Sequence, residues 1–143
     1  MLSLGAGRRR SRVFSGLAVV AAILLGLASR RYPGAVPAVL GKYPGDALWA
    51  MVVFFGWGTL QPKASTVQIA ALAFLTSIVV EVLKLYQAPW IVDVRHTTLG
   101  HLVFGHVFSF GNIAAYAVGI VTAVGVDGLY FLRSADRSSG RDL

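Results

Sequence analysis

The chain has 143 residues, of which 56% are hydrophobic and only 13% are charged, and its mean hydropathy is +0.69. In a soluble domain of this size about a quarter of the residues are charged. The composition therefore argues against a soluble enzyme and predicts a single integral membrane domain. The absence of cysteine excludes a disulfide framework and a thiolate metal site. The net charge of +7 does not predict nucleic-acid binding, because the basic residues flank apolar runs and form no recognition helix.

The first apolar run, about residues 13–28, follows a basic tail over residues 1–12. A basic start, an apolar centre and small residues near the end are also typical of a cleaved signal peptide. Arg9 and Arg10 ahead of Phe14 faintly match a twin-arginine signal. We favour a retained helix, because further spans follow in the same chain.

Three further apolar runs come close to the length of about 20 residues that a membrane span needs. They cover about residues 46–61, 66–86 and 112–132. The run 46–61 would reach only about 24 Å at 1.5 Å per residue, so it needs thin membrane or length from its flanks. Ser65 and Gln68 have the spacing of a capping box. These runs predict an all-α integral membrane protein with four transmembrane helices in one membrane domain, about residues 13–132.

Three other segments connect or follow the spans. Residues 97–110 are apolar but too short to span comfortably, which suits a re-entrant or interfacial half-helix. Residues 29–45 contain several prolines and glycines and cannot form one continuous helix, and their apolar centre AVPAVL should rest at the lipid interface. Residues 133–143 are polar, with Ser and Gly, and are predicted to be a disordered cytoplasmic tail.

The basic residues favour four crossings over five. With four crossings, eight basic residues lie on the side of the membrane that holds both termini, and five lie on the opposite side. If residues 97–110 also crossed, only five basic residues would lie on the N-terminal side and eight on the opposite side. The eight are Arg8, Arg9, Arg10, Arg12, Lys63, Arg133, Arg137 and Arg141, and the five are Arg30, Arg31, Lys42, Lys84 and Arg95. We therefore predict cytoplasmic N- and C-termini in a bacterial plasma membrane.

One face of the third run carries small residues at three- and four-residue steps, Ala70, Ala73 and Ser77, and then Glu81. Small residues let a neighbouring helix approach closely, so this face should turn Glu81 inward, about 7 to 8 Å below the helix end. An unpaired carboxylate is costly inside a membrane. We expect Arg95 to be its partner, because a guanidinium can bind a carboxylate through two hydrogen bonds.

The last run repeats this pattern with Ala115, Gly119 and Ala123 at four-residue spacing. Asn112 and Tyr116 lie on an adjoining face, also four residues apart. Asn112 is placed to cap this helix while its side chain turns toward the same site as Glu81.

Two aspartates allow both a structural and a site role. Asp46 follows Pro44 and Gly45, where it could be a helix N-cap, although a cap can also face a site. Asp127 lies near the cytoplasmic end of the last run, where we expect it to pair with Arg133 or Arg137.

Three histidines, His96, His101 and His106, raise the question of a metal site. They recur every five residues, about 140° apart on a helix, whereas helical metal pairs prefer a four-residue step. We therefore expect no metal and no cofactor. A histidine at this position more often hydrogen-bonds to a loop carbonyl or titrates.

Three stretches, YPGDALWAMVVF, EVLKLYQAPWIVDVRHTTLGHLVFGHVF and NIAAYAVGI, together resemble a bacterial family known as domain of unknown function 2809. The resemblance covers roughly residues 30–122 and is fairly specific in its order of Gly-Asp-x-Leu-Trp, Glu, Pro-Trp, Arg, Gly, Phe and Ala-Tyr. More distantly, the arrangement is similar to the VanZ-like family linked to teicoplanin resistance. The resemblance implies a four-helix membrane protein and supplies no activity. The family pattern often has Gln in place of Lys84 and Asp in place of Asn112, which weakens any role that needs a carboxylate at residue 112.

The predicted site is a polar cluster in the outer half of the membrane, covered by residues 97–110. Its candidate ligand-binding residues are Asp46, Glu81, Arg95, His101, Asn112 and Tyr116. The leading hypothesis is a non-enzymatic module that binds a small amphiphilic or cell-envelope ligand and gives tolerance to an envelope-directed compound. The expected partners are the lipid bilayer and this unidentified ligand, without nucleic acid.

Two alternatives stay open. A proton-coupled transporter is weakened by the few helices and the lack of an inverted repeat, although a homo-oligomer would supply more helices. A membrane enzyme acting on lipid-linked substrates is weakened by the absence of a recognisable nucleophile or metal motif.

Overall fold

The computed structural model describes residues 9–32, 34, 37, 43–104 and 108–140. Within these residues the fold is all-α, as predicted, with six helices and no strand. The helices are α1 (Arg12–Arg31), α2 (Tyr43–Leu60), α3 (Thr66–Leu83), α4 (Pro89–His96), α5 (Thr98–Phe104) and α6 (Phe110–Ser139).

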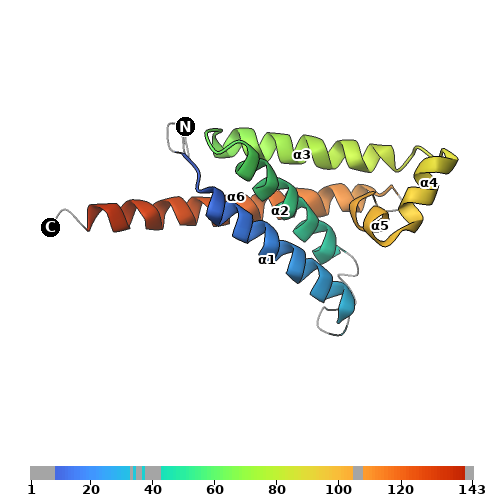
Figure 1. The fold of residues 1–143 in the computed structure, drawn as a ribbon, viewed down its shortest axis with the longest axis horizontal. Coiled ribbons are helices and arrows are strands. Elements are labelled where there is room, and N and C mark those ends of the chain that lie inside the picture. Colours follow the sequence, from blue (N-terminus) through green and yellow to red (C-terminus); the bar gives the residue numbers. More distant parts are fainter. Residues whose placement is uncertain (1–8, 33, 35–36, 38–42, 105–107, 141–143) are drawn as a thin grey trace.

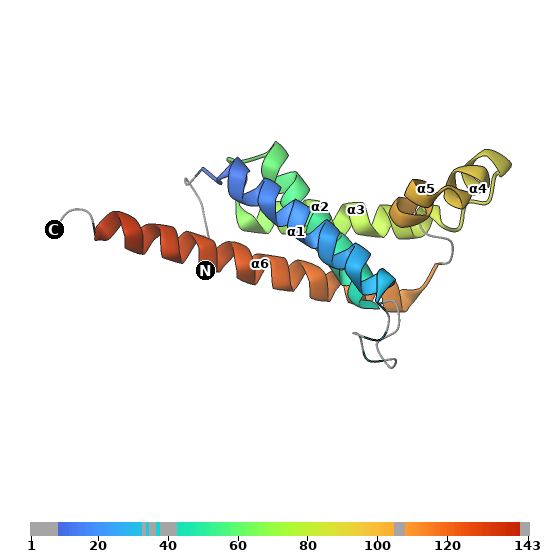
Figure 2. The same ribbon diagram turned by 60° about the horizontal axis from the view of Figure 1, so that its bottom comes forward.

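Four long helices form an antiparallel bundle (Figure 1). Helices α3 and α6 run side by side in opposite directions, and α1 and α2 form a second antiparallel pair that crosses them obliquely. Helix α2 contacts α1, α3 and α6 and is therefore the central helix. The short helices α4 and α5 lie at one end of the bundle, which we call the α5 end; the turn at Pro62 lies at the other, the Pro62 end (Figure 2).

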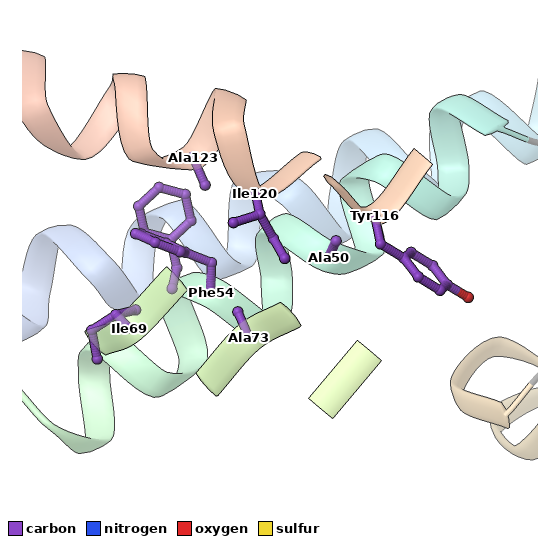
Figure 3. Packing of buried hydrophobic residues seen from close by; sticks show 8 residues of the cluster. Ala50, Phe54, Ile69, Ala73, Tyr116, Ile120 and Ala123 are labelled. Atoms are coloured by element: carbon purple, nitrogen blue, oxygen red, sulfur yellow. The ribbon is translucent and has the colours of Figure 1, made fainter. Parts of the chain in front are cut away.

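The core of the bundle is apolar and comes from three helices (Figure 3). Its buried residues are Ala50, Phe54, Phe55, Ile69, Ala73, Tyr116, Ile120 and Ala123. The predicted small-residue faces do pack inward: a Cβ atom at Gly119 would lie 2.1 Å from the carbonyl oxygen of Ala47. Only glycine therefore permits this approach of α6 to α2.

Three helices in the described part of the chain are long and apolar enough to cross a membrane: α1, α3 and residues Phe110–Arg137 of α6. Many Leu and Val side chains of α1, such as Leu17 and Leu24, are exposed, as expected for a surface that contacts lipid. The chain is thus a membrane protein. Helix α2 is not among the three candidates, because the polar residues of its first turn dilute its apolar stretch.

Helix α6 is longer than the predicted span. It continues through Ser139, so residues 133–139, expected to be disordered, are helical. The reason is that this stretch contains no Gly or Pro before Gly140, whose N–H donates to the carbonyl oxygen of Asp136 at 3.1 Å. At 1.5 Å per residue the 30 residues of α6 reach about 45 Å, which exceeds the hydrocarbon thickness of about 30 Å.

The segment after α3 differs most from the prediction. Helix α3 ends at Leu83, and α4 was not expected. Pro89 begins α4, as suits a residue that lacks an N–H. Of the predicted half-helix 97–110, α5 occupies the first part, residues 105–107 lie outside the described residues, and residues 108–109 are not helical. Most of the AVPAVL segment also lies outside them.

Candidate functional site

Glu81, in the last turn of α3, is completely buried at the α5 end and is surrounded by hydrogen-bond donors. Its Oε2 atom accepts from Lys84 Nζ at 2.6 Å and from the Tyr116 hydroxyl at 2.8 Å. Its Oε1 atom accepts from the backbone N–H of Ser109 at 2.7 Å and from Asn112 Nδ2 at 3.0 Å. We call these five residues the Glu81 cluster.

The Glu81 cluster joins three parts of the chain. Each carboxylate oxygen accepts two hydrogen bonds, which matches the roughly four lone-pair positions of an ionised carboxyl group. Lys84 is only 6% exposed, and its ammonium group also lies 3.3 Å from the Tyr116 hydroxyl. Because both buried charges are compensated and hydrogen-bonded, the cluster fastens α3 to α6 and to the backbone just before α6.

The predicted pairing of Glu81 with Arg95 is wrong. Arg95 lies on α4, is 2% exposed, and donates from Nη1 to the Tyr86 carbonyl oxygen at 2.7 Å and from Nη2 to the Leu83 carbonyl oxygen at 2.5 Å. It therefore satisfies one carbonyl group at the C-terminal end of α3 and one in the turn that follows. Lys84, one helical turn after Glu81, takes the position at the carboxylate.

Two of the remaining predicted site residues form hydrogen bonds with Glu81. Asn112 and Tyr116 do contact Glu81, although Asn112 lies in the first turn of α6 and is not its cap. Asp46 also lies inside the first turn of its helix and is not an N-cap; it is half-buried and close enough to Tyr116 to act on it electrostatically. His101 is exposed on α5, and no described contact of Glu81 involves it.

A second buried polar cluster lies at the Pro62 end and was not predicted. Arg10, which is 3% exposed, forms an ion pair with the fully buried Asp127 of α6. Thr66, the first residue of α3, donates its hydroxyl to the same carboxylate at 2.9 Å. The backbone N–H of Arg10 donates to the Pro62 carbonyl oxygen at 2.6 Å, and its guanidinium lies 5.5 Å from the Phe131 ring centre.

The predicted pairing of Asp127 with Arg133 or Arg137 is therefore wrong. Helix α6 continues past both arginines and leaves them exposed. The sequence contained one signal of the true arrangement: Asp127 continues the inward ladder of Gly119 and Ala123, so its partner had to come from another element.

The two polar clusters are separated by the apolar core. Figure 3 shows Tyr116 at one end of the core, with its hydroxyl pointing away from the other labelled residues. Of the described residues, no group of three or more His, Asp and Glu side chains is placed to hold a metal ion, and His106 lies outside the described residues.

An apolar groove of about 240 Å³ lies between α1 and α2 and is bordered by Leu99 of α5. It is lined by Ala22, Ile23, Gly26, Leu27, Arg30, Gly45, Trp49, Val52 and Leu99. Arg30 is the one charged residue of this lining. The Trp49 ring centre lies 5.5 Å from that of Tyr116, so the wall of the groove touches the Glu81 cluster.

The family model described as "Protein of unknown function (DUF2809)" matches residues 35–120, more than half of the chain. The chain belongs to this family. The matched part of the DUF2809 sequence includes the whole Glu81 cluster, whereas Arg10 and Asp127 lie outside it. No solved structure matches the chain. The resemblance to this family is confirmed, and the distant one to the VanZ-like family stays a prediction.

Proposed function

We propose that this DUF2809 protein is a non-enzymatic plasma-membrane module that binds a small amphiphilic, cell-envelope type of ligand at the α5 end. The groove between α1 and α2 carries the proposal. Its lining is apolar apart from Arg30, which lies in the last turn of α1. Ligand sites typically combine an apolar lining with a few polar groups that fix orientation. This groove suits an acyl or prenyl chain with an acidic headgroup next to the guanidinium.

In this proposal the Glu81 cluster supports the site and does not itself contact the ligand. Both oxygens of Glu81 are already occupied, so a ligand would have to displace an existing donor. The cluster instead fixes Tyr116, which packs against Trp49 in the wall of the groove. With four crossings and cytoplasmic termini, the groove would open toward the outer leaflet.

The observations favour binding over transport. A proton-coupled carrier would need a polar path between the two ends, and the packed core between the two polar clusters, which includes Phe54 and Ile120, is apolar. The buried hydroxyl of Ser77 donates within its own helix, to the carbonyl oxygen of Ala73. Ligand-driven proton or solute flux in proteoliposomes, lost in Glu81→Gln, would overturn this ranking in favour of the carrier. Turnover of a lipid-linked substrate would overturn it in favour of an enzyme.

The test uses quenching of Trp49 by a brominated fatty acid. The chain has three tryptophans, and Trp57→Phe with Trp90→Phe leaves Trp49 as the only tryptophan, which is excited selectively over the tyrosines. In phosphatidylcholine nanodiscs we expect saturable quenching. Gly26→Leu should abolish the saturable phase, because a side chain at Gly26 enters the groove without a close contact at Cβ. Gly16→Leu on the same helix, where a Cβ meets nothing within 4 Å, is the matched control.

A matched pair of variants tests the contact between Arg30 and the headgroup. Arg30→Gln should weaken binding of the brominated fatty acid about five- to tenfold, the range expected for one cation near an anionic headgroup. Arg31→Gln removes the same charge from the next residue, which does not line the groove, and should leave the affinity unchanged. Quenching that never saturates, or that is equal in the Gly26→Leu and Gly16→Leu proteins, would contradict the proposed site.

A further inference from the structure

The arginines next to α1 point in two directions. Arg10 turns inward to Asp127 and is buried, whereas Arg9 and Arg12 are exposed. The hydrogen bond from Arg10 N–H to the Pro62 carbonyl oxygen attaches this segment to the turn between α2 and α3. Arg9 and Arg12 are thereby held beside Lys63, which belongs to that turn.

A surface pocket of about 610 Å³ results at the Pro62 end. Its lining is Arg9, Arg12, Leu60, Gln61, Pro62, Lys63, Ala64 and Gln68. Three of these side chains are cations and none is a carboxylate. The Gln68 oxygen already accepts from the backbone N–H of Ser65 at 3.0 Å, so its amide NH₂ group is what remains to meet a ligand. The pocket therefore offers positive charge and N–H donors, which is the chemistry that an anion requires.

We propose that this pocket binds a phosphate group, carried by an acidic phospholipid or present as free phosphate. Guanidinium groups match phosphate oxygens with pairs of parallel hydrogen bonds. The position favours the lipid source: Arg12 is the first residue of a candidate span and Lys63 lies three residues before another, at Thr66, so both cations lie at headgroup depth. Clusters of basic residues at this depth attract anionic lipids. The inference does not rest on the groove, which lies toward the other end of the bundle.

Native mass spectrometry of the detergent-purified protein with added phosphatidylglycerol tests the proposal. Arg12→Gln with Lys63→Gln removes two pocket cations. Arg133→Gln with Arg137→Gln removes the same charge from the exposed extension of α6 and is the matched control. We expect phosphatidylglycerol affinity to fall at least tenfold in the pocket variant and to stay unchanged in the control. Phosphatidylcholine, whose headgroup carries no net charge, should bind more weakly to the wild type.

Two further measurements, competition by inorganic phosphate and the thermal midpoint without lipid, make each outcome of the experiment decisive. Inorganic phosphate that displaces phosphatidylglycerol from the wild type would assign free phosphate as a ligand of the pocket, and its failure to do so would assign the lipid. Equal loss of binding in the pocket and control variants, or none in the pocket variant, overturns the proposal. The thermal midpoint without lipid should match the wild type in both, because the replaced side chains are exposed. Arg9→Gln with Lys63→Gln repeats the test if the first pocket variant does not fold.

Discussion

At the scale of single residues, the buried carboxylate of Glu81 depends on Lys84. Two opposite charges taken out of water are tolerated only when they are close and their remaining hydrogen-bonding positions are filled. Here the two atoms lie 2.6 Å apart, and Tyr116, Asn112 and the Ser109 N–H occupy the remaining positions on the carboxylate. Removing either partner leaves an uncompensated charge in the buried interior of the bundle.

We therefore predict that Glu81→Gln and Lys84→Met each lower the free energy of unfolding by about 2–4 kcal/mol. The double variant should lose at least about 1 kcal/mol less than the sum of the two, because residues in one ion pair are energetically coupled. Unfolding in mixed detergent and SDS micelles, followed by tryptophan fluorescence, measures all three. Strictly additive losses would mean that Lys84 does not compensate the charge of Glu81.

At the scale of elements, the end of α3 and the position of α4 depend on each other. The last carbonyl groups of a helix have no partner within the helix. The carbonyl oxygen of Leu83, the last residue of α3, and that of Tyr86, in the turn that follows, accept hydrogen bonds from Arg95 of α4. A guanidinium can reach both because its N–H groups are spread in a rigid plane. These two hydrogen bonds therefore attach α4 to the end of α3 and to the turn that follows it.

We predict that Arg95→Ala increases hydrogen–deuterium exchange in α4 and in the turn after Leu83 by at least tenfold, with α1 unaffected. Arg95→Lys should give an intermediate effect, because an ammonium group cannot hold the two carbonyl oxygens in the same way. Asp93→Ala, an exposed position on the same helix, is the control and should exchange like the wild type. Unchanged exchange in Arg95→Ala would show that α4 is held by other contacts, such as those of the buried Ile91.

At the scale of the whole molecule, α6 connects two buried polar clusters across an apolar core. Asn112 belongs to one and Asp127 to the other. The fifteen helical steps from Asn112 to Asp127 correspond to about 22 Å, somewhat less than the hydrocarbon thickness of about 30 Å. In the predicted four-crossing arrangement each cluster would lie a few ångströms inside one membrane surface, where buried charge costs less than at the centre. The four long helices run in alternating directions (Figure 1), and three of them qualify as candidate spans in the described part of the chain, so the four crossings stay a prediction.

The topology can be tested with single cysteines, because the chain has none of its own. A cysteine at Gly34 should react with an impermeant maleimide in intact cells. Cysteines at Lys63 and Gly140 should react only after the membrane is permeabilised. Reaction at residue 140 in intact cells would favour five crossings, and reaction at residue 63 would show that α2 does not cross.

The sequence by itself determined the features that depend on helical periodicity. Ala73, Ser77 and Glu81 had to share a face, and so did Gly119, Ala123 and Asp127, because residues three and four apart lie together on a helix. Both faces are buried in the structure. Hydrophobic length likewise predicted an all-helical membrane protein, and the ordered motifs predicted its family.

Only the tertiary structure decided which side chains meet. Periodicity fixes the face on which Glu81 lies, but not how far one helix is shifted or rotated against the next. The pair of Glu81 with Lys84 is a local contact three residues apart, which periodicity allowed, and it was overlooked in favour of Arg95. By contrast, nothing in the local pattern of Asp127 pointed to Arg10, more than one hundred residues away. The contacts of a buried charge depend on distances between separate elements, which the packing of the four long helices and the return of α4 set.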